Sequence, residues 1–253
     1  MSALIIATVV FICCFGAALA GMVLHVKVPD HQLDGDSKEV VKLVMGLIAT
    51  MAALVLSLLI ASAKSSYDTQ ATELQQISAN IVQLDGILEL YGPETKEIRS
   101  ALRQTVMEAD QRIWHADQGA KAIMDSSHIR DGAALFYAKL HGLSPTNGQQ
   151  RSAIASALQI GSALGHTRIL MFEQSGDSIP WLLEGILLFW VSMLFMGFGL
   201  FARSHVTIIA AFLVGAISVA SATFLILELS QPYDGMMRLS DAPLRSALAI
   251  IDQ

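Results

Sequence analysis

The chain has 253 residues, of which 53% are hydrophobic and 15% are charged, and its formal net charge is −6. Soluble domains carry about a quarter charged residues, so this composition argues against a wholly soluble protein. The basic residues form no dense cluster, which argues against nucleic-acid binding because phosphate contacts need grouped Lys and Arg side chains.

Four apolar stretches without a charged residue lie in two pairs around a long polar middle region. They cover 2–24, 43–63, 185–202 and 206–227. A helix rises ~1.5 Å per residue, so about 20 residues cross the ~30 Å hydrocarbon core of a bilayer. The sequence therefore predicts a multipass membrane protein of the all-α class, with the lipid bilayer as its first partner.

The two pairs are predicted to form transmembrane hairpins. Only residues 203–205 connect the second pair, and three residues cannot cross a membrane, so its two helices run antiparallel. The N-terminus, the middle region and the tail then share one face. We predict a first transmembrane hairpin over 1–63 (helices about 2–24 and 43–63), a helical extramembrane domain over 64–179, a second transmembrane hairpin over 180–229 (helices about 181–202 and 206–228), and a tail with a short helix over 230–253.

The orientation is not set by basic residues near the helix ends, because each face carries four of them. On one face these are Lys64, Arg168, Arg238 and Arg245, and on the other Lys27, Lys38, Lys42 and Arg203. The positive-inside rule therefore favours neither orientation. We expect the middle region to be cytoplasmic and the membrane to be the bacterial inner membrane, because that region is large and no signal would export it.

The middle region has the apolar spacing of amphipathic helices. Leu74, Ile77, Ile81, Leu84 and Leu88 recur at steps of three and four residues. No proline or glycine occurs between 47 and 85, so we expect the second membrane helix to continue out of the bilayer until Gly92-Pro93 ends it. A further helix is expected from about Pro93, and others over 131–141 and 149–174.

Small and weakly polar residues follow one face of the second membrane helix. They are Gly46, Thr50, Ala53, Ser57 and Ala61, and Lys64 completes the row. Two interpretations stay open. Small residues let helix backbones approach in lipid, which gives a packing seam. Alternatively, the hydroxyls line a path and replace water around an ion. Both hold if the seam lies between subunits around a central axis.

Three charged residues are predicted at one membrane level, on the face of the middle region. They are Lys64, Glu184 and Glu228. A charge buried in the membrane without a partner costs several kcal/mol, so an ion pair from Lys64 to either carboxylate is one interpretation. The other is that these side chains reach the interface individually. At a pore mouth the carboxylates would favour cations.

Small residues also recur on the last two membrane helices. Gly185, Ser192 and Gly199 follow a seven-residue step, and Gly215 and Ser218 lie on the next helix. This pattern predicts seams that hold the second hairpin together.

No pattern of catalytic residues is present. His25 and His31 lie in one connector, but no further ligand completes a metal site. No nucleophile–base pair or phosphate-binding glycine loop occurs. We therefore expect no enzymatic activity, no cofactor and no metal.

Several motifs spread along the chain resemble those of the bacterial bestrophin-like membrane family. They are 45–50 (MGLIAT), 53–68 (ALVLSLLIASAKSSYD), 90–95 (LYGPET), 227–229 (LEL), 232–235 (PYDG) and 242–248 (APLRSAL). The chain departs from the family at Asp85-Gly86, where an arginine usually follows the aspartate, and at Trp114-His115, where Trp-Pro is frequent. The family itself has no established activity, and its likeness to true bestrophins, which are pentameric chloride channels, is remote.

These observations together favour an ion channel or channel-like pore. Four helices cannot enclose a wide path alone, so we expect a homo-oligomeric ring, with inorganic ions as its substrate and the small-residue face of the second helix as its lining. The alternative is a membrane-anchored scaffold or partner-binding protein with no conduction path.

Overall fold

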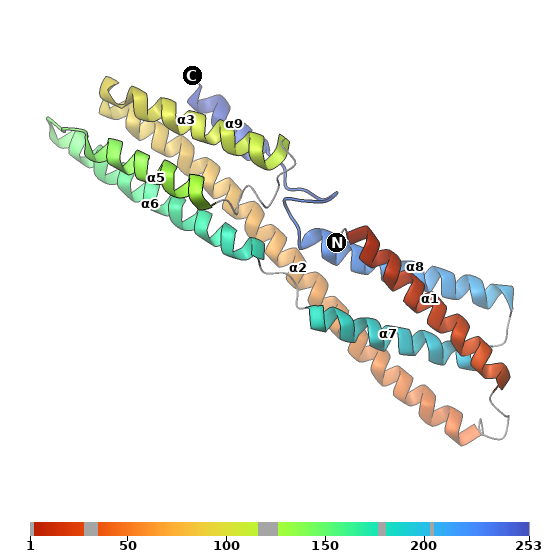
Figure 1. Ribbon diagram of the computed structural model, residues 1–253. Coiled ribbons are helices and arrows are strands. Elements are labelled where there is room, and N and C mark those ends of the chain that lie inside the picture. The colour runs from red at the N-terminus through yellow and green to blue at the C-terminus, as the bar shows by residue number, and fades with distance from the viewer. Residues whose placement is uncertain (1–2, 28–34, 116–125, 177–180, 203–204, 253) are drawn as a thin grey trace. The chain divides into compact units, whose positions relative to one another are not determined.

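The computed structural model describes residues 3–27, 35–115, 126–176, 181–202 and 205–252, and the described part is almost entirely helical (Figure 1). No strand occurs among these residues, so the predicted all-α class is confirmed. By its contacts the chain divides into two compact units. The membrane unit consists of Met1–Ser65 and Ser178–Ser230, and the extramembrane unit consists of Ser66–Asp177 and Gln231–Gln253.

Helix α2 belongs to both units, because it runs without interruption over Gly35–Tyr91, 57 residues. The prediction that the second membrane helix continues until Gly92-Pro93 is confirmed. Gly92 has φ 131°, a backbone conformation open to glycine, and Pro93 then begins the short 3-10 helix η2 (Pro93–Thr95). The Thr95 hydroxyl donates to the Leu88 carbonyl at 2.5 Å, which fixes the chain reversal.

The membrane unit contains α1 (Ala3–Lys27), the first part of α2, α7 (Trp181–Phe201) and α8 (Val206–Leu229). Among the described residues, four helices are long and apolar enough to cross a membrane. In these helices every backbone N–H and C=O can be satisfied within its own segment, which is why a lipid environment selects them.

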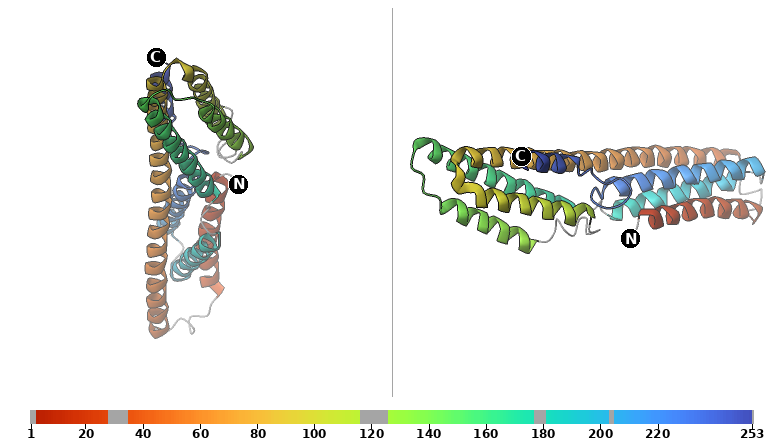
Figure 2. Two further views of the ribbon diagram at one scale, coloured as in Figure 1. Left: turned by 90° about the vertical axis from the view of Figure 1, so that its left-hand side faces the viewer. Right: turned by 90° about the horizontal axis from the view of Figure 1, so that it is seen from above.

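Helix α1 packs closely against both α7 and α8 (Figures 1 and 2). Val10 and Cys14 of α1 and Ala216 of α8 form one buried cluster, which Phe195 of α7 adjoins. Helix α1 is therefore the element on which both α7 and α8 pack.

The prediction that small residues on α7 bind it to α8 is wrong for Gly199. A Cβ added at Gly199 would collide with the Ala18 carbonyl oxygen of α1, and one at Gly21 would collide with the Met196 carbonyl oxygen. Glycine at both sites lets the backbones of α1 and α7 come into direct contact. Gly215 fits the prediction better, since its nearest neighbour is the Phe195 ring of α7.

The extramembrane unit consists of the second part of α2 and the helices packed along it. These are α3 (Lys96–Asp110), the π-helical turn η3 (Gln111–His115), α5 (Ser126–His141), α6 (Gly148–Gly176) and α9 (Ala242–Ile251). Its core contains residues of the predicted amphipathic face, including Leu84 and Leu88, with Ile98, Leu140 and Ala157. The segments predicted over 131–141 and 149–174 are confirmed as helices, although α5 begins earlier.

The two departures from the family motifs have local structural counterparts. Asp85 is followed by Gly86, but its carboxylate is bound by Arg99 of α3 through two hydrogen bonds of 2.8 Å and 2.7 Å. At Trp114-His115 the chain forms the π-helical turn, and the Trp114 indole N–H donates to the Leu239 carbonyl at 2.8 Å. This bond fixes the segment that leads into α9.

The first prediction concerns the close contact of α1 and α7. Gly199→Ala adds a Cβ against a backbone atom, which cannot move aside like a flexible side chain, so it should cost about 1–3 kcal/mol. The thermal unfolding midpoint of the purified protein should fall by roughly 2–4 °C per kcal/mol. Gly185→Ala is the matched control, since Gly185 is on the same helix with open space around it. Equal midpoints for the two variants would contradict the packing.

The second prediction concerns the Asp85–Arg99 pair. Asp85→Ala leaves the partly buried guanidinium without its two-point partner and should destabilise the protein by about 1.5–3 kcal/mol. Glu89→Ala is the control, because Glu89 is exposed and 3.6 Å from the same guanidinium, and it should change stability little. In a double-mutant cycle the Asp85→Ala and Arg99→Ala costs should not add; additive costs would show that the pair is not coupled.

Candidate functional site

One side of the α2 membrane segment is buried within the membrane unit. Met45, Ala52, Leu59 and Ala63 are each less than 9% exposed, and they lie on one stripe because they recur at seven, seven and four residues. The stripe faces α7 at least at Met45, since a Cβ added at Gly197 would lie 2.7 Å from the Met45 Sδ. The orientation of α2 in its unit is set by this stripe.

The small-residue face lies well away from the buried stripe. At roughly 100° per residue, its centre is about 135° around the helix from the stripe. All five members of this face are exposed: Gly46, Thr50, Ala53, Ser57 and Ala61. In the described chain, α2 therefore packs through residues other than those of the small-residue face.

The hydroxyl groups on this face are held by the helix itself. Thr50 Oγ1 donates to the Leu47 carbonyl and Ser57 Oγ donates to the Ala53 carbonyl, both at 2.8 Å. A hydroxyl that donates its proton in this way keeps lone pairs that can accept a hydrogen bond or contact a cation. The face thus presents acceptor oxygens set in a row of small side chains.

A ridge of leucines borders this face on the side away from the buried stripe. Leu43, Leu47, Leu54 and Leu58 are highly exposed, Leu54 at 71% and Leu58 at 66%. The sequence does not separate this ridge from the rest of the span, because apolar residues are expected all round a helix in lipid. Only the position of the buried stripe shows that these leucines are free to contact lipid or another subunit.

The three predicted membrane-level charges differ in burial. Lys64 is exposed, Glu184 is partly exposed, and Glu228 is 6% exposed at the end of α8. A carboxylate with so little access to water near the membrane needs polar or cationic surroundings. The ion pair of Lys64 with Glu184 or Glu228 stays a prediction.

Of the two histidines noted around the connector between α1 and α2, only one lies among the described residues. His25 is partly buried, whereas His31 lies outside the described residues. Among the residues that the structure describes, no three His, Cys, Asp or Glu side chains are grouped so that they could hold a metal ion. Cys13 is exposed and Cys14 is buried, and both are free thiols.

Comparison with known proteins identifies the fold. The profile of the bestrophin-like domain matches residues 12–244. A crystal structure of a bacterial bestrophin homologue from Klebsiella pneumoniae, which carries a point mutation, superposes with a TM-score of 0.70. The match covers 96% of this chain and 99% of that chain at 12% sequence identity, a level at which it shows the fold alone. No curated protein matches the sequence.

The sequence motifs, the four apolar helices and the domain match agree with one another. The chain is an integral membrane protein with a bestrophin fold, and it belongs to the bestrophin-like family.

Proposed function

We propose that this protein is an ion channel or channel-like pore, built as a homo-oligomer with the small-residue face of α2 along its path. The observation that carries the proposal is that Thr50, Ser57 and their small neighbours stay outside the stripe through which α2 packs. Acceptor oxygens that face lipid find no hydrogen-bond donor and no ion there. If the same oxygens face a conduction path, they can accept hydrogen bonds from water or contact a cation.

A symmetric ring is the assembly that fits this chain. One subunit has four membrane helices in its described part, and α1 packs on both α7 and α8. Four helices of which three pack in this way are too few to enclose a wide path within one subunit. A heterologous interface that closes into a ring would place the same face of α2 from every subunit around one axis. The family resemblance to bestrophins, which form pentameric rings, supports this arrangement.

The chemistry of the proposed lining favours cations over chloride. Hydroxyl lone pairs accept rather than donate, and Glu184 and Glu228 would add negative charge at one mouth of the path. This preference runs against the chloride selectivity of true bestrophins. We further propose that the protein lies in the bacterial inner membrane with its extramembrane unit in the cytoplasm.

The third prediction concerns assembly. The purified protein should be a closed ring with an axial opening, measured as subunit number by native mass spectrometry and as pore radius by electron microscopy. In the ring, Ser57 should lie nearer the axis than Leu59. A solid dimer without an axial path would contradict the channel and favour the alternative of a membrane-anchored scaffold or partner-binding protein.

The fourth prediction concerns conduction in liposomes. Ser57→Leu replaces a small acceptor by a bulky apolar group on the lining, so it should reduce ion flux several-fold or more. Thr50→Ala should reduce flux less, because it removes an oxygen without narrowing the path. Separate potassium and chloride gradients measure which ion is carried.

The matched control is Ser62→Leu, the same exchange on the same helix. Ser62 is also exposed but lies roughly 140° around the helix from the small-residue face, so its flux should match that of the wild type. Each variant is first checked for unchanged assembly by gel filtration. Wild-type flux in both Thr50→Ala and Ser57→Leu would remove α2 from the path.

A further inference from the structure

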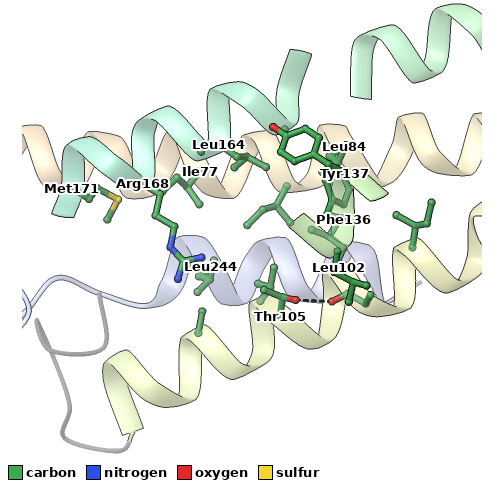
Figure 3. Close-up of a pocket in the computed structure, with 18 of the residues that line it drawn as sticks. Ile77, Leu84, Leu102, Thr105, Phe136, Tyr137, Leu164, Arg168, Met171 and Leu244 are labelled. Atoms are coloured by element: carbon green, nitrogen blue, oxygen red, sulfur yellow. Dashed lines mark hydrogen bonds between the residues drawn. The ribbon is translucent and has the colours of Figure 1, made fainter. Parts of the chain in front are cut away.

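The extramembrane unit contains an apolar cavity that the proposed conduction path does not use. The cavity has a volume of about 280 Å³ and is lined by residues of α2, α3, η3, α5, α6 and α9 (Figure 3). Its lining on α2 runs from Leu74 to Leu84, and that on α6 from Gly161 to Met171. Ten residues of helix span ~15 Å, so the cavity is elongated along these two helices.

The few polar groups of the lining are mostly engaged with the protein. Thr105 Oγ1 donates to the Ala101 carbonyl at 2.8 Å, and the Trp114 indole donates to the Leu239 carbonyl. Lys139 Nζ lies 3.8 Å from a carboxylate oxygen of Glu97. These groups therefore offer little to a polar ligand.

Arg168 differs from these groups because it is a cation without a carboxylate partner among the described residues; the Tyr137 hydroxyl is a further, neutral polar group of the lining. Its side chain extends from α6 into the space between the helices, toward Leu244 of α9 (Figure 3). Among the residues that the structure describes, no carboxylate forms an ion pair with it. Burial and then the like charge of Arg112 lower the pKa of the Arg168 guanidinium, as expected for a cation without a counter-charge.

Arg112 is itself a cation, and among the described residues the structure places only an exposed carboxylate near it. Its nearest acidic partner is Glu108, 3.8 Å away and exposed on the same helical segment. Arg168 therefore makes this end of the cavity positive, and the like charge of Arg112 adds to it from outside the lining. Most of the other lining residues, such as Ile77 and Phe136, are apolar. Keeping the Arg168 guanidinium partly buried without a counter-charge costs free energy, and a bound anion would reduce that cost.

We propose that this cavity binds a single-chain amphiphile with a carboxylate head, of the fatty-acid class, with the carboxylate on Arg168 and the alkyl chain along α2 and α6. Arg is suited to this role because its planar fork can hold a carboxylate through two hydrogen bonds. The volume lies just below the ~300–1,000 Å³ typical of small-molecule pockets, which suits one alkyl chain rather than a two-chain lipid. The proposal does not depend on conduction.

Trp114 provides a direct reporter, because it lines the cavity and the other two tryptophans, Trp181 and Trp190, lie on α7. In a Trp181→Phe, Trp190→Phe background, in lipid nanodiscs, bromododecanoate should quench Trp114 fluorescence saturably. Unlabelled dodecanoate should reverse the quenching, whereas dodecyltrimethylammonium, which has the same chain length and the opposite charge, should not. The same dodecanoate should raise the unfolding temperature.

Two sets of variants test the contact with the carboxylate head and the space for the alkyl chain separately. Arg168→Gln should weaken dodecanoate binding at least about tenfold, and Arg168→Lys should keep part of the affinity. Arg151→Gln, on the same helix but exposed and outside the cavity, is the control. Gly165→Leu should weaken binding by filling space, since a Cβ at Gly165 meets no atom within 4 Å, and Gly86→Leu, equally open but outside the cavity, should not.

Three results would overturn the proposal. The first is quenching of Trp114 that does not saturate, or no quenching at all, as expected if another part of the assembly fills the cavity. The second is equal competition by dodecyltrimethylammonium, which would show that the positive end selects nothing. The third is wild-type affinity in Arg168→Gln. Flux through liposomes is measured independently and decides none of these outcomes.

Discussion

The architecture depends on one uninterrupted helix. Backbone groups inside a bilayer must be satisfied within their own segment, and α2 meets this requirement and then continues as a helix outside the apolar stretch, to Tyr91. Its 57 residues rise about 85 Å at the standard helical pitch. Because no glycine or proline occurs between 47 and 85, the same helix contributes a stripe to the membrane unit and an amphipathic face to the extramembrane unit.

The faces of α2 differ in whether the chain itself buries them. In the membrane segment, the stripe that includes Met45 and Leu59 is buried by the chain itself, and the face that includes Thr50 and Ser57 is left outside it. In the extramembrane unit, Ile81, Leu84 and Leu88 are buried in the core, and neighbouring positions border the cavity at whose positive end Arg168 lies.

The membrane helices, the continuation of α2 and the end at Gly92-Pro93 were predictable, because length, hydropathy and helix breakers are local properties. Which membrane helices pack together was not. Gly199 repeats at a seven-residue step that any neighbouring helix would satisfy, and nothing in the sequence says that Ala18 of α1 is the neighbour. In lipid, apolar side chains gain no burial from one partner over another, so close backbone fit decides the choice.

The candidate site also has features that the sequence predicts and features that only the folded chain shows. Spacing along a helix fixes which residues share a face, so the amino-acid order was enough to place Thr50 and Ser57 in one row of small residues on α2. It was not enough to show that this row is left uncovered, or that Arg168, merely near a membrane helix in the sequence, faces an apolar cavity. Both facts come from the folded chain, because exposure depends on residues far apart in sequence, such as Leu74 and Leu244, meeting around one space.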